Sequence, residues 1–219
     1  MTFFKHISIF GRLTLFILSS VGLGLFASHV SAAPVVQGYV MVVQMTPAIC
    51  VLDHQKNKKR QCLEGYALNI SGLFPETSNP ECRTTSSAIL SPLQAKVVAR
   101  VMPDENARVQ LWHAIGGCIP MNASQYFRTM INYAERLKIP AELTSPETRV
   151  MNVSNLQGRF LRLNPTLLMK SIKFNCSTTH GTAILTEVKL CYASNGQYKK
   201  CSIAVETHCP ASFTIKGSY

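Results

Sequence analysis

Eight cysteines constrain the fold of this 219-residue chain more than any other feature of its sequence. They stand at Cys50, Cys62, Cys82, Cys118, Cys176, Cys191, Cys201 and Cys209. In an exported chain, an even number of cysteines is typical of a disulfide framework. Zinc binding is the weaker interpretation, because the spacings are irregular and no Cys-x-x-Cys pair occurs. The sequence therefore predicts a disulfide-stapled fold with neither a metal site nor a cofactor.

The N-terminus indicates that the chain is exported. Lys5 and Arg12 precede an apolar run over residues 13–27, and the small residues Ser31-Ala32-Ala33 follow it. This order is typical of a secretory signal peptide, and the run is too short to span a bilayer comfortably. We expect residues 1–32 to be removed and the mature protein to be periplasmic or secreted, without a transmembrane segment. An uncleaved N-terminal anchor is the alternative.

Residues 33–219 have the length and apolar content of one domain and show no internal repeat. The formal charge of +11 falls to +9 when the signal peptide leaves, because Lys5 and Arg12 leave with it and no acidic residue does. A basic field of this size attracts polyanions, such as nucleic acid, anionic membrane or acidic polysaccharide, without choosing among them. A basic surface with no cognate partner is the other interpretation.

Hydrophobic periodicity predicts strands at both ends of this domain and helices between them. The expected strands cover residues 38–45, 66–71, 171–176, 182–192 and 197–206. Expected helices begin at Ser91 and cover 124–138, with shorter ones at 145–147 and 165–170. Ser91 is placed as N-cap and Pro92 as first helical residue, and the buried face is expected to carry Leu93, Val97, Val98 and Val101. The pattern predicts an α+β fold with an antiparallel sheet flanked by helices.

Three segments resemble the active-site region of the ribonuclease T2 family. Residues 42–50 (VVQMTPAIC) resemble the family's first strand, which ends in a Gln-Trp-Pro-like stretch and a cysteine. Residues 71–76 (SGLFPE) are similar to the first motif, usually His-Gly-Leu-Trp-Pro, and residues 111–118 (LWHAIGGC) stand in the place of the second. With matches near the C-terminus, the resemblance to the bacterial ribonuclease I type covers essentially the whole mature chain. It implies the T2 fold and RNA cleavage through a 2′,3′-cyclic phosphate.

The catalytic positions of that family carry unsuitable residues in this chain. The reaction needs two imidazoles for proton transfer, and a Lys and a Glu that stabilise the phosphorane. The first-motif His falls on Ser71; counted back from Cys118, the second His falls on Ile115, the Lys on Ala114 and the Glu on Leu111. An unaided serine hydroxyl is no general base at neutral pH, and the other three side chains offer neither proton nor charge. The resemblance therefore implies a catalytically inactive member.

His113 is the one residue that could rescue catalysis. In a helix, residues 113 and 115 lie about 200° apart around the axis, so we expect His113 to face away from the catalytic position. A ribonuclease with a feeble or rebuilt site around His113 stays open as an alternative. His54, His180 and His208 have no recognisable acid–base partner in the sequence.

Gln44, Phe74 and Glu76 match positions that contact bases in some members of the family. Stacking of a base on an aromatic ring is worth about 1–3 kcal/mol and tolerates any base, so Phe74 could still hold RNA. The alternative is that Phe74 belongs to the core. We expect RNA or nucleotides as partners, with no DNA specificity implied. A protein-interaction module that keeps only the fold is the third hypothesis.

The cysteine pairing follows in part from the resemblance, which implies Cys82–Cys118 and Cys176–Cys209. Local geometry favours Cys50–Cys62 and Cys191–Cys201. The last pair flanks the turn signal Asn195-Gly196. A two-residue loop would place position 200 opposite 191, so a bridge to Cys201 requires a three-residue loop or a bulge.

Overall fold

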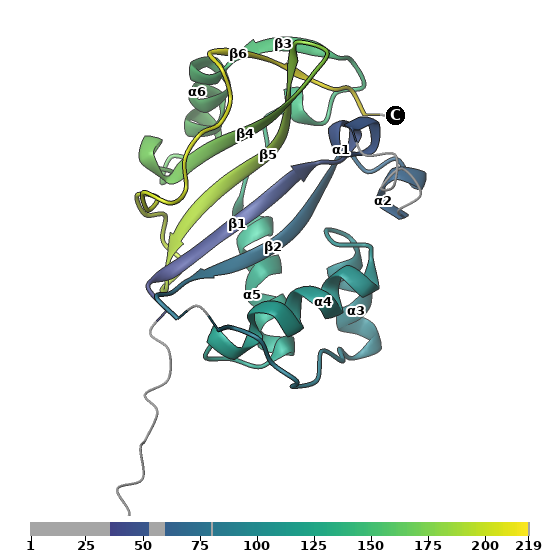
Figure 1. Ribbon diagram of the computed structural model, residues 1–219, viewed down its shortest axis with the longest axis vertical. Helices are drawn as coiled ribbons and strands as arrows, with labels where there is room; N and C mark the ends of the chain where they lie inside the picture. Colours follow the sequence, from purple (N-terminus) through teal and green to yellow (C-terminus); the bar gives the residue numbers. More distant parts are fainter. Residues whose placement is uncertain (1–35, 53–59, 80, 219) are drawn as a thin grey trace, which may run out of the picture. The chain divides into compact units, whose positions relative to one another are not determined.

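A six-stranded sheet organises the part of the chain that the computed structural model describes, residues 36–52, 60–79 and 81–218 (Figure 1). The strands are β1 (Gly38–Met45), β2 (Leu68–Glu76), β3 (Arg149–Asn152), β4 (Ile172–Thr179), β5 (Thr182–Ala193) and β6 (Ser212–Ile215). They lie in the order β2-β1-β5-β6-β3, and β4 pairs with β5. All pairings are antiparallel except a short parallel contact between β5 and β6. The α+β fold with a mainly antiparallel sheet is confirmed.

The helices differ in length and in how they begin. They are α1 (Thr46–Leu52), α2 (Arg60–Leu63), α3 (Pro92–Ala99), α4 (Glu105–Ile115), α5 (Ala123–Arg136) and α6 (Val153–Leu163), with 3-10 turns η1 (Gly116–Cys118), η2 (Ala141–Leu143) and η3 (Met169–Ser171). Helix α3 begins as predicted, because the Ser91 side chain accepts a hydrogen bond from Gln94 N and Pro92 follows it. Helix α5 begins with a capping box between Asn122 and Gln125.

The alternation of side chains along β1 separates two faces of the sheet. Tyr39, Met41 and Val43 belong to the main core, while Val40 and Val42 pack in a small cluster with Cys191 and Cys201 on the opposite face. Helix α5 covers the core face with a strongly amphipathic surface whose buried residues include Tyr126, Phe127, Met130, Ile131 and Tyr133. The second face carries the polar residues that matter for the site.

Tyr126 ties helix α5 to β2 within this core. Its hydroxyl accepts a hydrogen bond of 2.9 Å from the backbone N–H of Leu73, inside the segment that resembles the first ribonuclease motif. Burial raises the pKa of the Tyr126 phenol, which therefore stays neutral at physiological pH.

Several sequence predictions were wrong at the local level. The second strand begins at Leu68 and continues to Glu76, so the first motif lies within the strand and not after it. Leu93 is 75% exposed, because α3 buries Val98 rather than its first turn.

Residues 145–147 do not begin a helix. They form a turn in which the Ser145 hydroxyl accepts hydrogen bonds from Glu147 N and Arg149 Nη2, and β3 begins at Arg149. Residues 165–170 contribute only to η3. Helix α6 was not predicted, although Leu156 and Phe160 are buried at helical spacing.

The predicted strand over residues 197–206 is also absent, for a topological reason. Strand β1 occupies one side of β5 as far as Ala193, and β4 occupies the other side as far as Leu190. Only the tip of β5 is left to pair, and the returning chain makes a single bridge between Tyr192 and Tyr198. Among the described residues, no strand follows until β6.

The four disulfides pair as predicted: Cys50–Cys62, Cys82–Cys118, Cys176–Cys209 and Cys191–Cys201. The β5 hairpin has a three-residue loop, since Ala193 N donates to Gln197 O across residues 194–196, but this loop does not bring Cys201 opposite Cys191. Lys199 rather than Cys201 lies opposite Cys191, and Cys201 returns to its partner after the chain has left the pairing.

No helix among the described residues combines the length and hydropathy needed to cross a membrane. Residues 1–35 and His54 lie outside the described residues, so the signal peptide stays a prediction.

Candidate functional site

A cleft of about 430 Å³ opens between β1, β2 and helix α4. Its lining residues are Gln44, Gln61, Asn69, Ile70, Ser71, Met102, Asp104, Ala107, Gln110, Leu111 and Ala114. The two segments that resemble the ribonuclease motifs therefore meet in space, although 35 or more residues separate them in the sequence. Three of the four vacated catalytic positions, Ser71, Leu111 and Ala114, line this cleft.

Ser71 lies at an irregularity in the pairing of β1 with β2. Val42 pairs with Gly72 and Val43 pairs with Ile70, so Ser71 is an extra residue with no direct partner. A β-bulge of this kind re-aims a side chain and is common beside active sites. The Ser71 hydroxyl is 3.4 Å from the carbonyl oxygen of Val42, to which it donates. The bulge thus presents Ser71 at the cleft, where an unaided serine hydroxyl is no general base at neutral pH.

One face of helix α4 forms the opposite wall. Ala107, Gln110, Leu111 and Ala114 recur at helical spacing along this face. The helix begins at the cleft, where the Asp104 carboxylate accepts a hydrogen bond of 3.1 Å from Ala107 N and so acts as the N-cap.

Ile115 and His113 lie away from the cleft. Ile115 is 8% exposed and packs in the main core. His113 lines a different hollow on the far side of α4, together with Val109 and Glu105, one and two turns before it. The structure thus places His113 outside the cleft, and its role relative to a catalytic position stays a prediction.

The cleft is lined by amide side chains that the sequence analysis did not single out, apart from Gln44. Asn69 Nδ2 donates to Gln44 Oε1 at 3.0 Å, and these two residues are directly paired across β1 and β2. Gln61 is 9% exposed, and its Oε1 is buried without a hydrogen-bond partner. Gln110 is exposed on α4. Gln61 reaches the cleft because the Cys50–Cys62 bridge holds α2 beside α1, which no local sequence pattern signals.

Phe74 and Glu76 are not among the residues that line the cleft. Phe74 is half-buried and packs against both hydrophobic clusters. A Cβ on Gly72 would lie 3.0 Å from the Phe74 ring and from Leu111 Cδ1, so Gly72 lets these two side chains approach each other. Glu76 is ion-paired with Lys199, which comes from the β5 hairpin. The predicted base-binding role of Phe74 and Glu76 stays a prediction.

The chemistry of the cleft follows from these groups. Among the described residues that line it there is no His, Lys or Arg, and its one carboxylate caps α4. Amides offer both donors and acceptors, which suit the hydrogen-bonding edges of bases. The lining can bind polar ligands, but the four vacated positions supply no group for proton transfer at neutral pH.

No protein-family model matches this sequence, and no curated protein matches it. Solved structures do match. A mutant of RNase MC1, a ribonuclease from bitter gourd seeds, in complex with 5′-UMP is 18% identical with a TM-score of 0.65, over 81% of this chain and 97% of that one. The self-incompatibility associated SF11-RNase of Nicotiana alata is 14% identical with a TM-score of 0.63, over 83% and 100% of the two chains. An RNase-related protein from Calystegia sepium is 13% identical with a TM-score of 0.61, over 83% and 97%.

These similarities confirm the predicted fold over almost the whole length of the compared proteins. They do not test the resemblance to bacterial ribonuclease I or the loss of catalysis, which stay predictions.

Proposed function

We propose that this chain, which has the ribonuclease T2 fold, is an exported protein that binds RNA or nucleotides in the cleft between β2 and α4 without cleaving them. The observation that carries this proposal is the lining of the cleft. The cavity persists with four amide side chains and a bulged serine, while the family's catalytic positions hold Ser71, Leu111, Ala114 and Ile115. Such a site keeps hydrogen-bonding capacity and lacks acid–base groups.

The sheet face that carries Gln44 also offers cations to a polyanion. Lys189 lies opposite Val42, and Lys173 lies opposite Lys189 in the next strand, so both lysines share the face of Val42 and Gln44. Lys189 is 3.6 Å from Glu187, which offsets part of its charge. The mature domain keeps an excess of nine positive charges, 20 Lys and Arg against 11 Asp and Glu. An RNA strand that leaves the cleft across this face of the sheet would meet a positive electrostatic potential, which attracts its phosphates.

Two mutants of RNase MC1 have been solved with 5′-UMP and 5′-GMP. Nucleotide binding on a similar fold makes nucleotides a reasonable ligand class here. We further propose that residues 1–32 are a signal peptide and that the domain over 33–219 works in the periplasm or outside the cell, where its four disulfides are stable.

The test combines RNA degradation with RNA binding by the oxidised protein. We expect no cleavage above a buffer control, and weak binding of single strands whose logarithmic salt slope is about −0.7 per phosphate neutralised. Robust cleavage that disappears in His113→Ala would contradict the proposal.

A matched pair of variants locates the binding. Ala114→Glu places a carboxylate in the cleft, and His113→Glu makes the same change in formal charge next to it on the far side of α4. Like-charge contact with phosphate should weaken RNA binding by about tenfold or more in the first variant only. Equal RNA affinities in the two variants would mean that binding is non-specific electrostatic attraction outside the cleft. That result would favour a protein-interaction module.

Phe74→Ala then tests stacking. If a base stacks on the exposed part of this ring, affinity should fall by about 1–3 kcal/mol without a change in the salt slope. An unchanged affinity would assign Phe74 to packing alone.

A further inference from the structure

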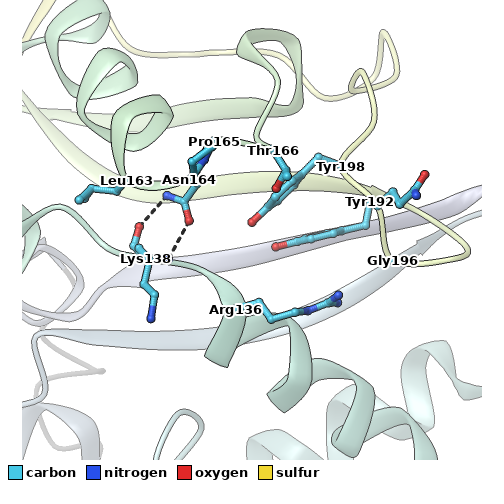
Figure 2. Close-up of a pocket in the computed structure, with 10 residues that line it drawn as sticks. Arg136, Lys138, Leu163, Asn164, Pro165, Thr166, Tyr192, Gly196 and Tyr198 are labelled. Carbon is cyan, nitrogen blue, oxygen red and sulfur yellow. Dashed lines mark hydrogen bonds between the residues drawn. The ribbon is translucent and has the colours of Figure 1, made fainter.

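A second pocket, of about 540 Å³, lies at the tip of β5, and its volume is within the usual range for small-molecule sites (Figure 2). Three segments that are distant in sequence form it: the end of α5, the loop after α6, and the β5 hairpin. The lining residues are Arg136, Lys138, Leu163, Asn164, Pro165, Thr166, Tyr192, Gly196, Gln197 and Tyr198.

This pocket is separate from the cleft. Tyr192 pairs with Tyr39, which lies on the core face of the sheet, whereas Gln44 of the cleft lies on the other face. No residue lines both cavities. A ligand in one site therefore does not occupy the other.

Three tyrosines form an aromatic stack, and two of them, Tyr192 and Tyr198, form the aromatic wall of the pocket. The ring centroids of Tyr133 and Tyr192 are 4.5 Å apart, and those of Tyr192 and Tyr198 are 4.9 Å apart with an interplanar angle of 32°. Tyr198 is the outer member and is partly exposed. Figure 2 shows the rings of Tyr192 and Tyr198 lying over one another at the pocket. The outer ring offers a surface on which a planar group can stack.

The Tyr192 hydroxyl has an unmet hydrogen-bonding capacity. Tyr192 is 2% exposed, and its hydroxyl makes no hydrogen bond of acceptable geometry with the described residues. Burial and the neighbouring Tyr198 raise the pKa of this phenol, so it is a neutral donor at physiological pH. A hydroxyl in this position can donate to a polar group of a ligand in the pocket.

Two cations lie at the rim of the pocket, and no acidic residue is among its described lining residues. The Arg136 guanidinium lies over the Tyr133 ring at 5.0 Å, and its Nε donates to the carbonyl oxygen of Asn132. Lys138 lies two residues further along the chain. This combination favours an anionic group next to the aromatic wall.

The frame of the pocket is held rigidly. The Asn164 side chain accepts from Lys138 N at 2.8 Å and donates to the carbonyl oxygens of Lys138 and Phe160 at 2.9 Å. Gly196 has φ +82°, and a Cβ there would lie 2.9 Å from the Tyr133 hydroxyl oxygen, so only glycine fits. A preorganised pocket loses less entropy when it binds a ligand.

We infer that this pocket binds a nucleoside monophosphate, with its base stacked on Tyr198 and its phosphate held by Arg136 and Lys138. The stacking surface and the two cations correspond to the two chemical parts of such a ligand. The inference does not depend on RNA binding in the cleft, since it rests on different residues.

The experiment is calorimetric titration with 5′-AMP, carried out on the wild-type protein and on Ala114→Glu, in which the cleft is blocked. We expect one saturable site to persist in Ala114→Glu. Adenosine and inorganic phosphate should each bind about tenfold or more weakly than 5′-AMP, because each supplies one half of the contacts. The amide signals of Gly196 and Gln197 should shift in an NMR titration.

Variants of the pocket provide the controls. Arg136→Gln combined with Lys138→Gln should weaken 5′-AMP binding by about tenfold or more, as expected when hydrogen bonds to charged groups are lost. Arg128→Gln combined with Lys96→Gln removes the same charge from exposed positions elsewhere and should leave the affinity unchanged. Tyr198→Ala should weaken binding by about tenfold, and Tyr198→Phe should retain it.

Three results would overturn the inference. These are the absence of saturable binding, loss of all binding in Ala114→Glu, or an equal loss in the two double variants. Failure of the cleft proposal has a different signature, since RNA binding would then be the same in Ala114→Glu and His113→Glu while 5′-AMP binding persists.

Discussion

The cleft beside α4 and the pocket at the tip of β5 share no lining residue and differ in their chemistry. The described lining of the cleft contains amides, a serine and one capping carboxylate, whereas the pocket presents tyrosines with Arg136 and Lys138. The cleft brings together the two segments that resemble the family's motifs, and its described lining contains no imidazole. The pocket has charged and aromatic groups in a place that the sequence analysis did not indicate.

The difference shows that the shape of a site and its reactivity are specified by different parts of the chain. Backbone features form the cleft: the bulge at Ser71, the close approach at Gly72 and the capped start of α4. These features depend on the backbone and do not require an imidazole in the cleft. The pocket depends on the side chains themselves, which meet only when α5, α6 and β5 pack together.

The largest effect is expected when acid–base side chains are introduced into the cleft. The combination Ser71→His, Leu111→Glu and Ala114→Lys, at the three positions that line the cleft, should raise RNA cleavage by about 10²–10⁴-fold through the one proton-transfer role that Ser71→His supplies. Cleavage rates measured with a fluorogenic RNA, beside the same variant carrying Ser71→Ala, test this. A folded triple variant that stays inert would show that the cleft differs from the catalytic geometry.

Removal of one disulfide at a time should lower the free energy of unfolding by different amounts for the bridge near α4 and the bridge near the pocket. The Cys82–Cys118 bridge closes 36 residues and ends beside α4, and Cys191–Cys201 closes 10 residues next to the pocket. Paired Cys→Ser substitutions should cost about 4 and about 3 kcal/mol respectively, because a longer loop restrains the unfolded chain more. Urea unfolding measures both losses of free energy, provided that the slope m is the same in the variants and in the wild type. A greater loss from the shorter loop would contradict the entropic account.

Removal of two buried tyrosine hydroxyls should change the free energy of unfolding in opposite directions. Tyr126→Phe leaves the Leu73 N–H unpaired behind the cleft and should lower the free energy of unfolding by about 1–3 kcal/mol. Tyr192→Phe removes a hydroxyl without a partner and should leave stability unchanged or raise it by up to about 1 kcal/mol. Thermal and urea denaturation of both variants provide the comparison. Equal losses would show that the Tyr192 hydroxyl is satisfied in solution.

The smallest effect is a pH dependence that both tyrosines share. Burial raises the pKa of Tyr126 and of Tyr192 above the unfolded value of 10.0. Above about pH 10 the unfolded state ionises first and binds fewer protons, so stability falls by about 1.4 kcal/mol per pH unit for each tyrosine. Urea midpoints at pH 9, 10 and 11 should show this decline. Each Tyr→Phe variant should have a shallower slope, and an unchanged slope would refute the assignment.

The elements predicted well from the sequence have strong local signals. Strand β1 has the predicted bounds, Ser91 caps α3, and α5 lies within two residues of its predicted ends. The disulfide pairs were also predicted, two of them from the family resemblance. The position of His113 followed from helical geometry once its segment was taken as a helix.

Only the tertiary structure decided the features that depend on distant segments. Among the described residues, no strand forms between Tyr198 and β6, because β1 and β4 already fill both sides of β5 below its tip. Gln61 reaches the cleft from α2, and Arg136 and Tyr198 meet at one pocket although 62 residues separate them. By itself the sequence determined which residues stand at the motif positions, the local caps and the alternation of strands, since these depend on neighbours within a few residues. Tertiary packing alone decides which strand edges can pair, which amides are buried and how the aromatic pocket forms. Each of these depends on which surfaces other segments already occupy.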